Sequence, residues 1–296
     1  MKDSFSDYHP LVNFLYFALV LLFAMVFMHP VCLLISLVCA FAYSIYLNRH
    51  KAIRFGLIFM LPMLIVTALV NPAFNHEGST ILEYLPSGNP LTLESIVYGI
   101  AAALMLIAVV NWFSCFNIVI TSDKFVYLFG RIIPALSLIL SMSLRLVPRF
   151  KAQIKVISNA QRCIGHDVSK GSVLRRVKNG IRILSIMITW SLENAIETAD
   201  SMKARGYGLV GRTAFSIFPF DRRDRIALIF LFIVGSYITT GALTGGLYFR
   251  YYPTIKSVPV ALYPVSLFAA QMALYLMPLI INVREDLKWK AIQSKI

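Results

Sequence analysis

Residues 95–119 read SIVYGIAAALMLIAVVNWFSCFNIV, and this stretch decides the class of fold. It is 25 residues long and contains no Asp, Glu, Lys or Arg. A helix needs about 20 mostly apolar residues to cross the hydrocarbon core of a bilayer. The stretch is therefore predicted to be a transmembrane helix.

The rest of the chain has the same apolar character. Of its 296 residues, 58% are hydrophobic and only 14% are charged, and the mean hydropathy is +0.72. A soluble domain of this length would be roughly 45–50% apolar and about a quarter charged. Six segments are long and apolar enough to span a membrane, or nearly so: 11–28, 31–47, 55–71, 95–119, 226–246 and 259–281. The sequence therefore predicts an all-α integral membrane protein with about six transmembrane helices and long cytoplasmic helices.

Two His/Asn-Pro pairs mark boundaries between these segments. His29-Pro30 is expected to form the turn between the first two spans, and Asn71-Pro72 to end the third.

The orientation of the spans follows from Lys and Arg in the short loops, which favour the cytoplasm. The loop at 48–54 and the tail after 282 are basic, whereas the 72–94 loop contains no Lys or Arg and three Glu. Both termini are therefore expected to be cytoplasmic, with six crossings between them.

A further apolar run at 127–147 is not counted as a crossing. An even number of crossings after residue 54 is needed to keep every basic segment inside, and the run contains Arg131, Pro134 and Arg145. We interpret it as a helix or broken helix on the cytoplasmic membrane face. The alternative, a true span with a neighbouring segment re-entrant, stays open.

The positive charge is concentrated in one segment. Residues 145–225 contain sixteen Lys and Arg against six Asp and Glu, a net charge of +10 out of +14 for the whole chain. Attraction to anionic headgroups explains part of this charge. Nucleic-acid binding is not expected, because no recognition motif interleaves aromatic residues with the charges. Docking of an acidic cytoplasmic partner is the third interpretation.

The pattern within this segment favours docking. Residues 149–164 and 172–205 are predicted to be helices, and the second carries apolar residues at steps of three and four. The members of this stripe are Val173, Val177, Ile181, Leu184, Ile188, Leu192, Ile196, Ala199 and Met202. Its middle, 183–192, is expected to be buried against other helices or the membrane. Glu193, Glu197 and Asp200 share one face and are expected to form surface pairs or contact neighbouring helices rather than catalyse a reaction.

The two predicted helices end in similar sequences. Residues 160–165 (AQRCIG) end the first and 201–206 (SMKARG) end the second, so the two glycines are 41 positions apart. Glycine after a helix is a common C-terminal cap, and a cation in the last turn suits the helix dipole. These could be two well-capped helices and nothing more. In the second, however, Arg205 beside Gly206 suits insertion into a carboxylate-lined groove of a partner.

The segment 199–208 (ADSMKARGYG) resembles the signature of the T component of energy-coupling factor (ECF) transporters, the EcfT/CbiQ family. That family carries two short Ala-Arg-Gly-like motifs at the ends of cytoplasmic coupling helices. Asn71-Pro72, the run 121–130 and the stretch 141–145 (SMSLR) also resemble it, so that the likeness covers about half of the chain, from 70 to 225.

The resemblance implies a set of ATPase-coupling residues. They are Ala204, Arg205 and Gly206 in the second motif, and Arg162, Cys163, Ile164 and Gly165 in the first. The first motif departs from the family, because Ile164 stands where Arg would precede the glycine. Arg162 lies about 200° around the helix from that position, so it either reaches over or leaves a weaker contact.

The resemblance further implies a division of labour among several chains. Two ABC-type ATPase subunits would bind ATP and dock on the coupling helices, so this chain would need no cofactor and would be a non-catalytic subunit. A small membrane protein, the S component, would capture a vitamin or other micronutrient. ATP-driven movement would pass through the coupling helices to that subunit. The location would be a bacterial or archaeal cytoplasmic membrane.

The expected organisation has three parts: N-terminal transmembrane helices at 1–120, the coupling-helix region at 121–225, and C-terminal transmembrane helices with a basic tail at 226–296. Gly241, Gly245 and Gly246 could let a substrate-binding subunit pack closely on the fifth span, or could serve packing within the chain. The four cysteines suggest neither a disulfide framework nor a metal site.

Two other functions remain as alternatives. A self-contained secondary carrier or permease, with the basic region regulatory, is disfavoured because the spans hold almost no ionisable residues. A membrane enzyme is disfavoured because no acid cluster, His motif or phosphate-binding loop is present in the sequence.

Overall fold

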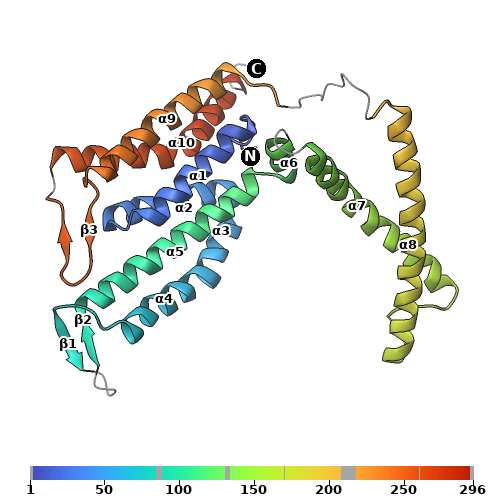
Figure 1. The fold of residues 1–296 in the computed structure, drawn as a ribbon, viewed down its shortest axis with the longest axis horizontal. Coiled ribbons are helices and arrows are strands. Elements are labelled where there is room, and N and C mark those ends of the chain that lie inside the picture. Colours follow the sequence, from blue (N-terminus) through green and yellow to red (C-terminus); the bar gives the residue numbers. More distant parts are fainter. Residues whose placement is uncertain are drawn as a thin grey trace. The chain divides into compact units, whose positions relative to one another are not determined.

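A computed structural model of the chain describes residues 3–84, 89–130, 134–169, 171–207, 218–259 and 261–293. The chain divides into two compact units, Met1–Lys124 with Phe218–Ile296 (the membrane unit) and Phe125–Ile217 (the helical unit). Figure 1 shows that helices make up nearly all of both. The fold class predicted from sequence, an all-α membrane protein, is confirmed.

The membrane unit is a bundle with α5 (Leu93–Val119) at its centre. Helix α5 packs against α1 (Pro10–Val26), α2 (Pro30–Asn48) and α4 (Leu61–Phe74). Helix α10 (Leu262–Gln293) packs against α2 and α9 (Arg222–Leu243), and α9 also contacts α1. The short α3 (His50–Phe55) and a π-helical turn (Gly56–Met60) lead into α4.

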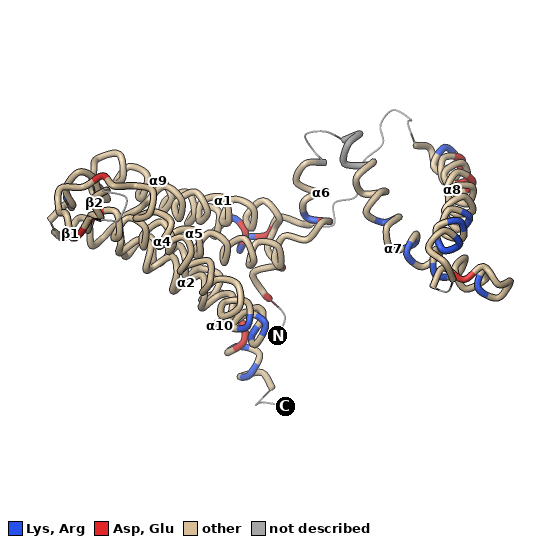
Figure 2. The backbone as a smooth tube through the Cα atoms, turned by 90° about the horizontal axis from the view of Figure 1, so that it is seen from below, with Lys and Arg blue, Asp and Glu red and all other residues tan. Residues whose placement is uncertain are grey.

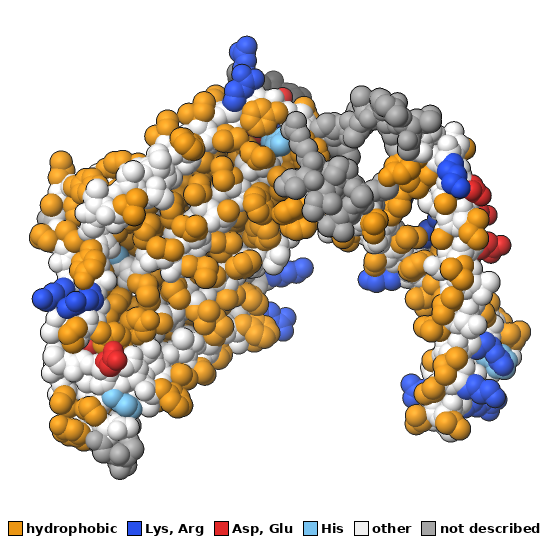
Figure 3. All heavy atoms as spheres, in the orientation of Figure 1, with side chains coloured by type: hydrophobic (Ala, Val, Ile, Leu, Met, Phe, Trp, Pro, Cys, Tyr) orange, Lys and Arg blue, Asp and Glu red, His pale blue; other side chains and the backbone are white. Residues whose placement is uncertain are grey.

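Five helical segments among the described residues are long and apolar enough to cross a membrane: 30–48, 50–74, 93–119, 222–243 and 262–293. Helix α1 is equally apolar but has 17 residues, which lies at the short end of the range for a spanning helix, about 17–25. Figure 3 shows hydrophobic side chains over most of the visible face of the membrane unit, with charged side chains near its margins.

Helices α1 and α2 begin with the same device. His9-Pro10 and His29-Pro30 each place proline in the first turn, where its missing N–H costs nothing. Each imidazole Nδ1 accepts a hydrogen bond from the backbone N–H two residues on, at 3.2 Å for His9 and 3.3 Å for His29. Burial lowers the pKa of both histidines, which favours the neutral ring that such an acceptor requires.

The prediction that Asn71-Pro72 ends the third span is wrong. The helix continues through Pro72 to Phe74. Proline cannot donate the hydrogen bond that the Ala68 carbonyl would accept, and α5 approaches this freed oxygen closely. A Cβ added to Gly99 of α5 would lie 2.8 Å from the Ala68 oxygen. Close packing against α5 therefore holds the interrupted helix in place.

Two other helices are longer than expected from the sequence. Helix α10 continues to Gln293, so that much of the basic tail predicted after residue 282 is helical. Helix α7 begins at Pro134 and runs through Pro148 to Cys163, so the predicted start at 149 is wrong. Helix α6 (Ser122–Gly130) covers the first part of the 127–147 run, whose residues 131–133, including Arg131, lie outside the described residues.

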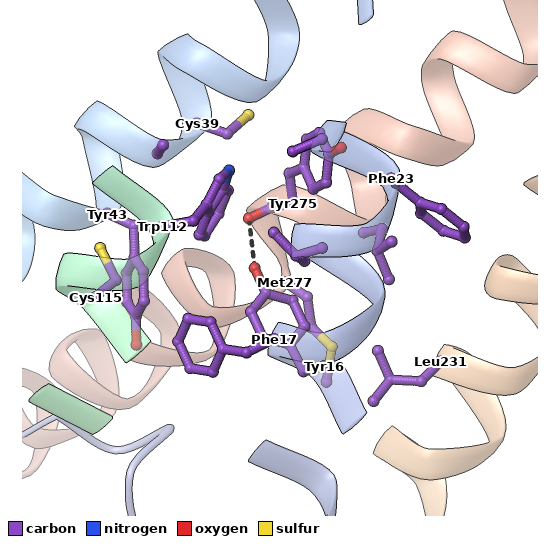
Figure 4. Close-up of a cluster of buried hydrophobic side chains, with 14 of the residues drawn as sticks. Tyr16, Phe17, Phe23, Cys39, Tyr43, Trp112, Cys115, Leu231, Tyr275 and Met277 are labelled. Carbon is purple, nitrogen blue, oxygen red and sulfur yellow. Dashed lines mark hydrogen bonds between the residues drawn. The ribbon is translucent and has the colours of Figure 1, made fainter. Parts of the chain in front are cut away.

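The core of the membrane unit is aromatic. Figure 4 shows Tyr16, Trp112 and Tyr275, contributed by α1, α5 and α10, meeting at its centre. Tyr16 Oη donates to the carbonyl oxygen of Tyr275 at 3.2 Å, and Trp112 Nε1 donates to Ser36 Oγ at 3.1 Å. These hydrogen bonds matter because a hydroxyl or an indole N–H that is buried without a partner costs free energy.

A buried polar network fixes the N-terminal segment beside the start of α6. Lys124 Nζ donates to the carbonyl oxygen of Val119 and to Ser6 Oγ, both at 2.9 Å. Asn282 Nδ2 donates to Asp3 Oδ1 at 2.7 Å, and the Phe5 N–H donates to Asn282 Oδ1 at 3.1 Å. Burial lowers the pKa of Lys124 and raises the pKa of Asp3.

A small hairpin closes the other end of the membrane unit. Strands β1 (Ile81–Tyr84) and β2 (Pro90–Thr92) are antiparallel, with Ile81 opposite Thr92. Glu94, only 2% exposed, accepts hydrogen bonds from Ser79 Oγ at 3.1 Å and from Thr80 Oγ1 at 2.9 Å. A second short pair, β3 (Phe249–Arg250) and β4 (Lys256–Ser257), lies between α9 and α10.

Candidate coupling site

The helical unit is built on α7 (Pro134–Cys163) and α8 (Val173–Ala204), joined by a short loop. The second helix, predicted at 172–205, is confirmed to within a residue at each end. The two helices meet at Trp190, whose ring lies 5.8 Å from that of Phe150 and 5.5 Å from the Arg149 guanidinium. Figure 2 shows Lys and Arg at several points along both helices.

The two helix ends share one backbone geometry. Gly165 and Gly206 both adopt the left-handed conformation, with φ of 83° and 74°. The Gly165 N–H donates to the Arg162 carbonyl at 3.1 Å, and the Gly206 N–H donates to the Lys203 carbonyl at 3.0 Å. In each case the next N–H donates to the carbonyl five residues back, at 2.9 Å from His166 and 3.0 Å from Tyr207. Both ends are thus Schellman caps, 41 residues apart.

The side chains carried by these matching ends differ. Arg205 is exposed, and its side chain makes no hydrogen bond or ion pair with a described residue. Its counterpart in the first cap is Ile164, which is 65% exposed. The second cap therefore presents a guanidinium and the first an apolar side chain at the same place.

Arg162 is turned toward its own loop. Its Nε lies 3.4 Å from Asp167 Oδ2, a residue two positions beyond the capping Gly165. The Asp167 carbonyl accepts from Asn179 Nδ2 of α8 at 3.0 Å, which ties the loop to the start of that helix. Within the described structure, Arg162 thus serves the loop between the helices. Sequence reasoning missed this arrangement, although the acid five positions after Arg162 signals it.

The apolar stripe of α8 is uncovered in the helical unit. Ile181, Leu184, Ile188 and Leu192 are each more than half exposed, whereas Ile183 is buried. Of residues 183–192, Ile183 alone is buried, and Trp190 is partly buried against α7. The rest of the stripe is available to a partner or to the membrane.

The acidic residues of α8 are also exposed, and Glu193, Glu197 and Asp200 form no ion pair with a described residue. The expected surface pairs are therefore not seen in this part of the chain. Lys203 follows Asp200 by three residues, a spacing at which helical ion pairs can form, but no Lys or Arg stands three or four residues from Glu193 or Glu197.

Gly241 and Gly246 lie against α10. A Cβ on Gly241 would come 2.3 Å from Leu267 Cδ2, and one on Gly246 would come 2.8 Å from Leu267 Cδ1. Gly245 has φ of 81° and nothing within 4 Å of an added Cβ. Two of the three glycines thus serve packing within the chain, and docking of an S component at this place stays a prediction.

Comparison with known proteins identifies the family of the chain. The family model described as CbiQ, cobalt transport protein, matches residues 3–216. The chain belongs to this family. The CbiQ match includes most of the membrane unit and nearly all of the helical unit, with both capped helix ends. It therefore confirms the resemblance drawn from the motifs.

Curated relatives point to the same family. The energy-coupling factor transporter transmembrane protein EcfT of Lactobacillus helveticus is 36% identical over 102 residues, covering 34% of this chain and 37% of that protein. The protein EcfT of Streptococcus equi is 35% identical over 104 residues, which cover 35% of this chain and 39% of that protein. EcfT of Bacillus selenitireducens is 26% identical over a longer match, which covers 66% of this chain and 75% of that protein. The chain thus matches little more than a third of the length of the first two relatives.

Proposed function

We propose that this CbiQ-family chain is the transmembrane coupling subunit of an ECF-type importer. Two ABC-type ATPases would dock on the ends of α7 and α8, and their ATP-driven movement would pass to a small substrate-binding S component. The cargo would be a vitamin or another micronutrient. The chain itself would be non-catalytic, and ATP would be bound by the ATPases.

The repeated cap at the ends of α7 and α8 carries this proposal. The cap alone is a common stop signal, and α9 ends with the same pair of hydrogen bonds at Gly245 and Gly246. What is particular to α7 and α8 is that both capped ends belong to one unit, 41 residues apart, and can therefore offer one surface to each of two ATPases. The exposed stripe on α8 supplies apolar area beside the second cap.

The two docking surfaces would not be equal. Arg205 can form a forked, charge-assisted pair with a carboxylate, whereas Ile164 can only pack into an apolar pocket. Since Arg162 is engaged with Asp167, we infer that the first contact depends on apolar packing. Two different ATPases, one for each helix end, would suit this asymmetry.

Affinity purification tests the proposal. The tagged chain would be purified in detergent from its native membranes, and its partners identified by mass spectrometry. We expect two ABC-type ATPases and a small polytopic membrane protein. Arg205→Glu should lower ATPase recovery by more than about tenfold, because the loss of a buried charged pair costs several kcal/mol. Arg182→Glu, the same charge reversal within α8, is the matched control and should retain both ATPases.

Other results would contradict the proposal. Equal ATPase recovery with Arg205→Glu and with wild type would remove the role of Arg205. Recovery of the chain alone, together with substrate transport into liposomes that lack any ATPase, would identify a self-sufficient carrier instead.

A further inference from the structure

A groove of about 890 Å³ lies in the membrane unit between α9, α10 and the N-terminal segment. Its walls are Ile226, Ala227 and Phe230 from α9 and Ala273, Met277, Ile280 and Ile281 from α10. At one end the lining changes to Ser4, Asp7, Tyr8, Arg223, Arg284, Glu285, Lys288 and Trp289. The groove is therefore apolar along its length and charged at its mouth.

The packing of α9 and α10 explains why the groove is open. The two helices touch closely where Gly241 meets Leu267, toward the far end of α9. At the start of α9 the exposed Ile226 leaves space facing Ile280 and Ile281. That end holds the N-terminal segment and the basic end of α10 and is predicted to be cytoplasmic (Figure 2).

The mouth of the groove holds an unsatisfied cation. Lys288 Nζ is 2.8 Å from Glu285 Oε1, and Arg223 lies 3.7 Å from Asp221 and stacks over the Tyr8 ring at 5.3 Å. The Arg284 side chain makes no hydrogen bond or ion pair with a described residue. One guanidinium at the mouth is thus left to bind an anion.

We propose that this groove binds an anionic phospholipid of the cytoplasmic leaflet, with an acyl chain along the apolar wall and the phosphate at Arg284. Both walls belong to helices that can span a membrane, so the apolar length faces hydrocarbon rather than water. The aromatic side chains Tyr8 and Trp289 stand at the mouth, where such residues favour the headgroup level. A soluble anion would use the mouth and leave the apolar wall empty.

A neutral lipid or a partner's transmembrane helix would not use Arg284 in this way. A neutral lipid has no net charge to offset the guanidinium, and an apolar helix would leave it unpaired in a desolvated place. Basic residues near a membrane surface attract anionic headgroups. The uncompensated charge is therefore the feature that selects the occupant.

Native mass spectrometry of the full chain in detergent tests this proposal. The chain would be titrated with phosphatidylglycerol and with phosphatidylcholine of identical acyl chains. We expect phosphatidylglycerol to bind at least about fivefold more tightly, because this ratio corresponds to the attraction of one basic residue for an anionic headgroup. Arg284→Gln should remove most of that preference. Lys290→Gln, the same loss of charge on the same helix outside the groove, should leave it unchanged.

A second pair of variants tests the apolar wall. Ala273→Trp places a large ring in the groove and should weaken the binding of both lipids, whereas Met272→Trp, on the neighbouring exposed position outside the lining, should not. Equal affinity for the two lipids in wild type, or equal effects of Arg284→Gln and Lys290→Gln, would overturn the proposal. So would unchanged lipid binding in Ala273→Trp.

Discussion

At the scale of single residues, Gly241 and Gly235 form a natural comparison within α9. An alanine Cβ at 241 would lie 2.3 Å from Cδ2 of Leu267, a fully buried side chain that would have to shift. At 235 the nearest atom, Leu19 Cδ1, would lie 3.4 Å away, an ordinary contact. The same substitution therefore meets two different surroundings.

Gly241→Ala is expected to lower the free energy of unfolding by about 1–3 kcal/mol, the usual cost of overpacking. Gly235→Ala should be neutral or stabilising by up to about 1 kcal/mol, because alanine is the better helix former. Denaturant unfolding of both variants in the same detergent measures the difference. Equal stabilities would mean that α9 and α10 can separate without cost.

Asp3 gives a prediction about pH. Burial raises its pKa above the ordinary value of 3.8, so the folded state holds its proton to a higher pH than the unfolded state. Its contribution is present in full below pH 3.8 and is lost as pH rises through the raised pKa. Asp3→Asn removes this titration. Thermal unfolding measured across the acid range should therefore show a flatter pH dependence in Asp3→Asn than in wild type.

The network around Asp3 and Lys124 could not be predicted from the sequence. Asp3 and its partner Asn282 are 279 positions apart, and Lys124 reads as one more cytoplasmic cation. The opposite holds for Arg205 and Gly206, because a helix cap is formed by neighbours in sequence. Local chemistry is predictable where its partners are local.

At the scale of helices, the bounds of α8 depend on neighbours in sequence and were predictable, whereas those of α4 and α7 were not. Helix α8 was predicted almost to the residue because its apolar period, its length and its glycine cap all lie within it. Pro72 was read as a boundary and the first coupling helix was predicted to start at 149, yet Pro72 and Pro148 both lie inside helices. For Pro72 the reason is the close approach of Gly99, a tertiary contact that no local rule contains.

The stripe of α8 yields a prediction for this element. Leu184 and Ile188 are 62% and 53% exposed, so replacing both with Gln removes little packing within the helical unit. The free energy of unfolding should therefore stay within about 0.5 kcal/mol of the wild-type value, and the helix content should not change. Under the proposed function, recovery of partner subunits should fall severalfold. Thr198→Gln, an exposed position of α8 outside the stripe, is the control and should retain them.

At the scale of the whole molecule, the predicted orientation can be tested by finding on which side of the membrane the helical unit and the β1–β2 hairpin lie. The orientation predicted from the sequence, six crossings with both termini inside, would place the helical unit in the cytoplasm and the β1–β2 hairpin outside. The cysteines offer a direct test, because Cys163 is exposed in the helical unit whereas Cys32, Cys39 and Cys115 are buried in spanning helices.

A membrane-impermeant maleimide should therefore label Cys163 in inside-out vesicles and leave it unlabelled in intact cells, with Cys163→Ser as the unlabelled control. Asn89→Cys, built into the Cys163→Ser chain, places an exposed thiol beside β2 and should show the opposite pattern. Labelling of both sites from one side would mean an even number of crossings between them. Since the span 93–119 lies between them, such a result would require a second crossing in the run 127–147, the alternative left open by the sequence.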